Sequence, residues 1–166
     1  DAEIKEVPEY NIFSENGQTA YTQLTLKNAD YFPIKTFRDL PTDPLSSLTS
    51  ALAKMQVGEG AAIQLLISPA DNKWKKVGRG YIGTTKKIEA NPDKASYKSD
   101  AKELEGIENK IGKPGFETII RIVVSSENKE QANSHLNNII NSFGQFIGIN
   151  TNFKKNRIRF KGLFMT

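Results

Sequence analysis

His135 is the only histidine among the 166 residues, and the chain contains no cysteine. The lack of cysteine excludes a disulfide framework, cysteine-ligated zinc, iron–sulfur clusters and a cysteine nucleophile. A Ser-His-Asp triad would have to use His135, which lies one position before Leu136 in a predicted helix with no activated nucleophile nearby. We therefore interpret His135 as a surface or boundary residue, and we expect no catalytic residue.

The glycine and carboxylate patterns give no reason to expect a nucleotide or metal site. Gly78, Gly80 and Gly83 form a G-x-G-x-x-G pattern, but a dinucleotide site needs that pattern directly after a buried strand. Here it lies inside a polar segment, and no G-x-x-x-x-G-K-[ST] sequence is present. Asp39 and Asp43 flank a helix start, where capping explains them. The sequence predicts no cofactor, no metal ion and no enzyme activity.

Two polar residues interrupt the two most apolar segments: Gln64 in AAIQLLI and Arg121 in TIIRIVV. Strand alternation places both on one sheet face, with their apolar neighbours turned toward the helices. Those neighbours are Ile63, Leu65, Ile67, Ile120, Ile122 and Val124. The face with Gln64 and Arg121 is either half-solvated or an interaction surface, where Leu66, Ile119 and Val123 would also be exposed.

The net charge of +4 is unevenly distributed along the chain. Residues 1–59 hold 5 basic and 9 acidic groups, whereas 73–113 hold 11 basic and 6 acidic ones. Residues 154–161 hold 5 basic groups and no acidic one. Basic segments of this kind favour polyanionic partners by steering and counterion release.

The C-terminal basic residues are a second candidate interaction surface, made by Lys154, Lys155, Arg157 and Arg159. Aromatic residues lie among the basic ones, a pattern that suits base stacking on a charged track. These aromatics are Trp74, Tyr81, Tyr97 and Phe160. Nucleic acid, in particular DNA, is therefore an alternative partner.

Periodicity predicts the elements that would position these residues. We expect an N-terminal β-hairpin over 10–27 turning at Asn16-Gly17, helices over 43–56 and 127–147, and strands over 61–68, 116–125 and 157–164. Asp43 is the expected cap of the first helix, and Ser125 or Ser126 that of the second. The expected core comprises Leu48, Leu52, Ile63, Leu65, Ile120, Ile122, Leu136, Ile140 and Phe143.

Residues 71–113 form a polar, basic insertion with predicted helices near 72–88 and 99–111 and a disordered stretch at 89–98. Outside it, the order is strand, helix, strand, then strand, helix, strand. This order predicts an α+β, ferredoxin-like split βαβ sandwich with its helices on one sheet face. We expect residues 1–166 to form a single domain, a fragment of a longer protein.

Several segments together resemble one family. They are DAEIKEVPEY, PIKTF, DPLSSLTSALAKMQVGEGAAIQLLISP with Trp74 after it, ELEGIENKIGKPGFETIIRIVVSS, NSFGQF and Asn152-Phe153-Lys154. The chain resembles the region between the membrane anchor and the ATPase core of type IV secretion (conjugation) coupling-protein-like ATPases of candidate-phylum bacteria. The resemblance transfers no catalytic residue.

The resemblance implies a cytoplasmic, membrane-proximal accessory domain whose partners are other domains or subunits of a membrane-associated ATPase complex. No run approaches the length of a membrane span, so we expect no direct membrane insertion by this segment. The favoured function is a non-catalytic assembly or docking domain of a conjugation-type DNA-translocating ATPase. The alternative is a nucleic-acid-binding module that uses the basic insertion and the C-terminal strand.

Overall fold

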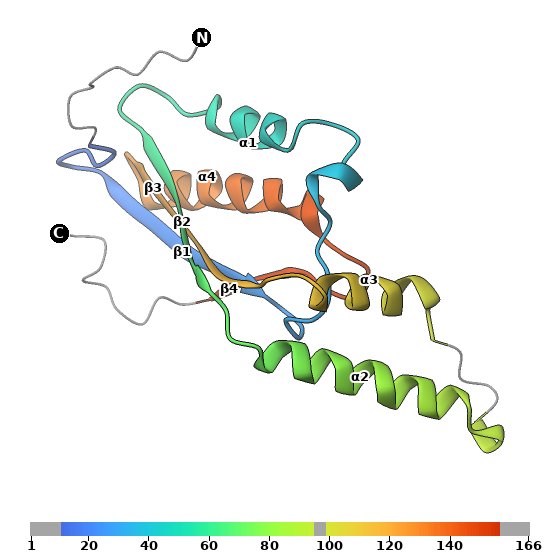
Figure 1. Ribbon diagram of the computed structural model, residues 1–166. Coiled ribbons are helices and arrows are strands. Elements are labelled where there is room, and N and C mark those ends of the chain that lie inside the picture. The colour runs from blue at the N-terminus through green and yellow to red at the C-terminus, as the bar shows by residue number, and fades with distance from the viewer. Residues whose placement is uncertain (1–10, 95–98, 157–166) are drawn as a thin grey trace, which may run out of the picture.

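The computed structural model describes residues 11–94 and 99–156 and confirms the α+β class (Figure 1). Its strands form one antiparallel sheet in the order β2-β3-β1-β4. The strands are β1 (Gln18–Leu26), β2 (Gly60–Pro69), β3 (Phe116–Ser126) and β4 (Phe153–Asn156). The α-helices are α1 (Pro44–Leu52), α2 (Lys73–Glu89), α3 (Ala101–Ile111) and α4 (Lys129–Ser142). Short 3-10 helices occupy Phe37–Asp39, Pro92–Lys94 and Phe143–Phe146.

Helices α1 and α4 lie side by side over one face of the sheet (Figure 1). The core between these layers follows strand alternation, because every second residue of β1 and β3 points toward the helices. Its buried apolar side chains are Ala20, Leu24, Ala51, Ile122, Val124, Ala132, Leu136 and Ile139. Most of the predicted core residues join them at least partly buried: Leu48, Leu52, Ile63, Ile120, Ile140 and Phe143.

The insertion contains the two helices that the sequence predicts, α2 and α3, and they form a hairpin with an apolar cluster of its own. Its buried side chains are Ile82, Leu104, Ile107 and Ile111. The segment after β1 fastens this hairpin to the rest of the chain: Tyr31 stacks on Tyr81 at 5.1 Å between ring centroids. Lys110 Nζ donates to the Phe32 carbonyl at 2.8 Å. Of the stretch expected to be disordered, residues 95–98 lie outside the described residues.

The start of α1 agrees with the prediction, and the start of α4 corrects it. Asp43 Oδ1 accepts the Leu45 amide hydrogen at 2.9 Å, and Pro44 is the first helical residue. In α4 the cap is Asn128, whose Oδ1 accepts from the Gln131 amide at 2.8 Å. Ser125 and Ser126 cannot cap this helix because both belong to β3. Helix α1 also ends earlier than expected, at Leu52.

The predicted N-terminal hairpin is wrong for the residues that the structure describes. Residues 11–17 contain no strand, although the Gly17 amide donates to the Ser14 carbonyl at 3.0 Å in a tight turn. β1 pairs instead with β3 on one side and β4 on the other. Gly17 has no positive φ; it is needed because an added Cβ would lie 2.8 Å from Ser125 Oγ.

The last strand begins earlier than predicted. β4 covers Phe153–Asn156, ahead of the strand predicted over 157–164. The Phe153 ring packs edge-on against Phe143 at 6.2 Å between centroids, which anchors the strand to the core. The predicted strand over 157–164 lies outside the described residues.

Candidate functional site

β2 is an edge strand, not the buried strand that its composition suggests. Leu65 and Ile67 are 56% and 62% exposed, so the expectation that they face the core is wrong. Ile63 still packs against the core, but β2 continues past α1 and α4 toward α2 (Figure 1). Phe116, which lies opposite Pro69 on β3, is 63% exposed. The far end of β2 therefore carries apolar side chains that no helix covers.

Gln64 and Arg121 come together as the alternation of their strands predicts. They are direct partners in the antiparallel β2–β3 register, and Arg121 Nη1 donates to Gln64 Oε1 at 3.4 Å. Gln64 is exposed, whereas Arg121 is half-buried. β3 is a central strand, but β2 is not, so the pair lies toward one side of the sheet face.

The apolar patch expected around this pair is not open. Val123 is only 5% exposed, and Leu66 and Ile119 are half-buried. The exposed apolar side chains of this part of the sheet are instead Leu65, Ile67 and Phe116, on the opposite face. We call β2 together with Phe116 the β2 edge.

The two edges of the sheet differ in charge. β2 has ten residues and no charged side chain, whereas the four described residues of β4 include Lys154 and Lys155. Lysine on an edge strand discourages pairing with another chain, whereas a long uncharged edge invites it. Within the described ranges, no backbone hydrogen bond joins the outer edge of β2 to another segment.

Lys154 and Lys155 do not form one basic track. They are consecutive in β4, so their side chains point to opposite faces of the sheet. Lys155 Nζ also donates to Asn137 Oδ1 of α4 at 2.6 Å. The other two residues of the predicted C-terminal surface, Arg157 and Arg159, lie outside the described residues.

The two described aromatic residues of the insertion, Trp74 and Tyr81, pack inward and are not free to stack on bases. Tyr81 stacks on Tyr31, and its hydroxyl donates to Glu103 Oε1 at 2.6 Å. The partly buried Trp74 ring packs against the hairpin cluster, with Lys75 Nζ 5.7 Å from the ring centroid. Tyr97 and Phe160 lie outside the described residues.

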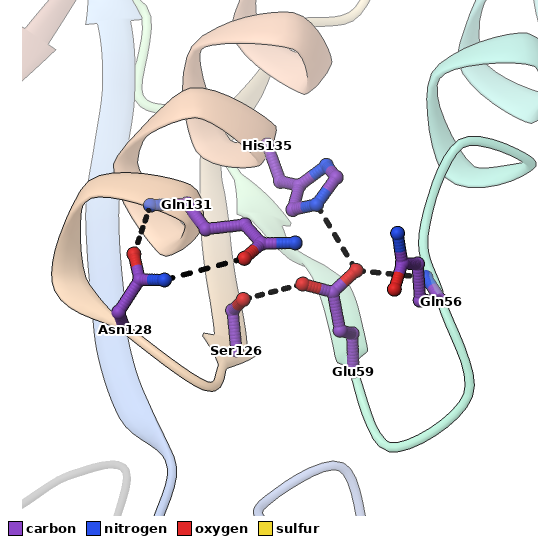
Figure 2. A network of polar contacts seen from close by, with 6 residues as sticks. All are labelled: Gln56, Glu59, Ser126, Asn128, Gln131 and His135. Carbon is purple, nitrogen blue, oxygen red and sulfur yellow. Dashed lines mark hydrogen bonds and ion pairs between the residues drawn. The ribbon is translucent and has the colours of Figure 1, made fainter.

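Glu59, Ser126 and His135 form a buried polar network that the sequence did not reveal (Figure 2). The Glu59 side chain is 2% exposed and contacts His135 Nε2 at 3.1 Å through Oε2. The same oxygen accepts the Gln56 amide hydrogen at 2.7 Å, and Oε1 accepts from the Ser126 hydroxyl. Three segments meet at this carboxylate: the α1–β2 loop, the end of β3 and α4.

The network is arranged for stability and not for nucleophilic chemistry. Ser126 donates to Glu59 and not to His135, so no imidazole activates the hydroxyl. Burial alone raises the pKa of the Glu59 carboxyl, but the hydrogen bonds from Ser126 and Gln56, together with His135, outweigh it. The net effect lowers that pKa, which keeps a charged carboxylate inside the fold.

His135 is buried, which corrects its interpretation as a surface or boundary residue. Its side chain is 11% exposed, and the contact with Glu59 is an ion pair only when the ring is protonated. Within the described part of the chain, neither ring nitrogen makes a well-aligned hydrogen bond. The local sequence gives no signal for this burial, because Glu59 lies 76 positions earlier in the chain.

A family model described as Domain of unknown function (DUF8128) matches residues 1–160. The chain belongs to this family. No curated protein and no solved structure gave a significant match. In this DUF8128 domain, residues 11–94 and 99–156 hold no group of three acidic or histidine side chains that could bind a metal ion. Over the same ranges, no helix has the length and apolar character needed to cross a bilayer.

Proposed function

We propose that this chain is a non-catalytic docking domain that binds a partner protein along the β2 edge. The observation that carries the proposal is the contrast in charge between the two sheet edges: β2 has ten residues without a charged side chain, whereas the described part of β4 carries two lysines. A long edge strand with unpaired backbone groups accepts an extended segment as a further strand. Leu65, Ile67 and Phe116 would then bury apolar surface against that segment.

The chemistry of β2 defines the partner that suits it. Main-chain hydrogen bonds give affinity in strand addition, and alternate side chains give specificity. An extended apolar segment matches Leu65 and Ile67 on one face, while Gln64 and Arg121 offer polar contacts at the other. A highly charged segment would leave its charges against this apolar surface, so we expect it to bind poorly.

We also propose that the sheet is ferredoxin-like. The order β2-β3-β1-β4, antiparallel throughout, supports this topology, as does the position of α1 between β1 and β2 and of α4 between β3 and β4. In such a fold the α2–α3 hairpin replaces the short connection between the second and third strands. Because that connection follows β2 directly, the hairpin lies next to the end of the β2 edge, and a partner bound along β2 would also lie close to the hairpin.

The context we propose is a membrane-anchored, conjugation-type ATPase, as the resemblance of the sequence implies. The partner would then be another domain or subunit of that complex, at a cytoplasmic, membrane-proximal position. A G-x-x-x-x-G-K-[ST] motif downstream in the same reading frame, and an apolar segment of about 20 residues upstream, would support this context. A reading frame without either would contradict it.

The docking test uses co-purification with the remainder of the parent protein. Leu65→Lys combined with Ile67→Lys should abolish the complex, because two charges would enter the apolar contact. Val57→Lys is the matched control: Val57 is fully exposed but lies in the loop before β2, so the complex should persist. Loss of the complex with the control variant, or its survival with the double variant, would refute docking at the β2 edge.

A second candidate function is nucleic-acid binding by the basic insertion and the C-terminal strand. The observation in its favour is the charge of α2, which carries six basic residues and a single acidic one. Binding to an oligonucleotide should then weaken steeply with salt. Replacing Lys154, Lys155, Arg157 and Arg159 with Glu tests the C-terminal part separately. Sub-micromolar affinity that this replacement removes would favour this function over docking.

A further inference from the structure

Two lysines and two glycines form a row of exposed residues along one side of α2. Lys76, Gly80, Gly83 and Lys87 follow one another at spacings of four, three and four, so they share one side of the helix. All four are exposed, and the buried residues of α2 lie on the opposite side. Arg79 flanks this row and is exposed as well. We call these five residues the α2 face.

The charges of the α2 face are not used within the described fold. Lys73 pairs with Asp71 at 3.3 Å and Lys86 with Glu108 at 2.9 Å. Lys76, Arg79 and Lys87, in contrast, form no ion pair with any described residue. Their positive charge is therefore available to a partner.

The two exposed glycines have no packing role in the fold. A Cβ added to Gly78 would lie 2.9 Å from both Ile111 and Tyr31, which explains that glycine. A Cβ added to Gly80 or Gly83 would meet nothing within 4 Å. Glycine in a helix interior lowers helix stability relative to alanine, so both residues carry a cost that no internal contact explains. Their lack of side chains lets another backbone approach the helix between the two lysines.

We propose that the α2 face binds the phosphate backbone of a nucleic acid, with Gly80 and Gly83 as the point of closest approach. Lys76 and Lys87 are eleven residues apart, or about 16 Å along the helix axis. That span equals the axial rise of about five nucleotides in one strand of duplex DNA. Contacts to phosphates position a protein on the nucleic acid without recognising the base sequence. The proposal rests on the second proposed function and narrows it to one helix face.

The test measures binding of a fluorescent 20-base-pair DNA duplex to the whole chain by anisotropy, between about 50 and 200 mM salt. Lys76→Glu, Arg79→Glu and Lys87→Glu together should weaken binding at least tenfold and flatten the salt dependence. The matched control reverses Lys27, Lys35 and Lys54, three exposed lysines outside the insertion. It changes the net charge equally and should retain most of the affinity. Circular dichroism spectra of both variants check that they fold.

A second variant tests the close approach without changing charge. Gly80→Gln with Gly83→Gln should keep or raise the melting temperature while weakening binding several-fold. Equal binding by this variant and the unmodified chain would overturn the role of the glycines. An equal loss of DNA affinity in the two triple charge-reversal variants would overturn the α2 face as the binding site.

The outcomes also separate this inference from the broader functions. DNA binding that depends only on Lys154, Lys155, Arg157 and Arg159 would overturn the α2 face while nucleic-acid binding stands. No DNA binding at low salt would overturn both and leave docking untouched. Binding to phosphatidylserine vesicles without binding to the duplex would overturn the nucleic-acid ligand in favour of an anionic membrane surface.

Discussion

Arg121 and Gln64 face each other across the β2–β3 pair, with Arg121 Nη1 3.4 Å from Gln64 Oε1. This contact joins a central strand to the edge strand on the face away from α1 and α4. Because the residues are direct partners in the register, a charge at position 64 lies close to the guanidinium of Arg121.

Opposite substitutions at Gln64 should therefore have opposite effects on stability. Gln64→Glu places an anion opposite Arg121 and should stabilise the fold by roughly 0.2–1 kcal/mol, whereas Gln64→Lys should destabilise it by a similar amount. Urea unfolding at low salt measures both, and added salt should reduce the difference. Equal stability of the two variants would show that the pair does not interact.

Replacement of Glu59 should cost stability at neutral pH and lose its effect in acid. Glu59→Gln removes a buried carboxylate that accepts hydrogen bonds from Ser126 and Gln56, at a cost of roughly 1–3 kcal/mol. Because the folded pKa of Glu59 is lowered, the carboxylate contributes stability above its unfolded pKa of about 4.3, and that contribution is lost as pH falls through the folded value.

Unfolding curves measured across this acid range test the Glu59 prediction. The curves of the unmodified chain and of Glu59→Gln should converge as the pH falls below about 4. Glu15→Gln is the control, since Glu15 is exposed and its replacement changes the charge in the same way. A constant gap between the unmodified chain and Glu59→Gln at every pH would assign the loss to packing and not to charge.

Two glycines of α2 should respond in opposite ways to alanine. Gly78→Ala places a Cβ 2.9 Å from Ile111 and Tyr31 and should destabilise the hairpin by about 1–3 kcal/mol. Gly80→Ala meets no neighbour and should stabilise the helix by about 0.5–1 kcal/mol. Thermal melting of the two single variants checks both signs. Destabilisation by Gly80→Ala would show that the outer side of α2 is covered.

Two apolar residues that point to the same sheet face should differ strongly in their energetic contribution. Ile122 is fully buried among α4 and the central strands, so Ile122→Ala should cost about 2–5 kcal/mol. Leu65 is mostly exposed, and Leu65→Ala should cost less than about 1 kcal/mol in the isolated chain. Chemical denaturation compares them. A large loss with Leu65→Ala would mean that the edge is already buried, for instance in a self-associated form.

Local patterns predicted the helices and the two apolar strands well because their signals lie within a few residues. Asp43 and Pro44 mark the start of α1 by their own chemistry, and strand alternation places Gln64 and Arg121 on one sheet face. The α+β class followed from the order of these elements. The bounds of α2 and α3 were within about two residues of the structure.

The predictions that the structure corrects depend on contacts between segments that are distant in the sequence. The hairpin prediction relied on the turn before β1, but residues 11–17 form no strand, and β1 pairs instead with β3 and with β4, which lies more than 120 positions later. Leu65 has the same local pattern as Ile63, and only the extent of the helical layer makes one exposed and the other packed. The Glu59–His135 contact is of the same kind: neither residue has a local feature that indicates the other.

The α2–α3 hairpin has an apolar cluster that shares no buried residue with the cluster beneath α1 and α4. Cooperative unfolding follows such clusters, so the hairpin can open as a local unit while the sheet remains closed. Its amide hydrogens should then exchange with solvent at a lower free energy than those of β1 and β3. A chain built in this way could exchange ligands on α2 by local opening, at a rate that the slow global unfolding of the sheet does not limit.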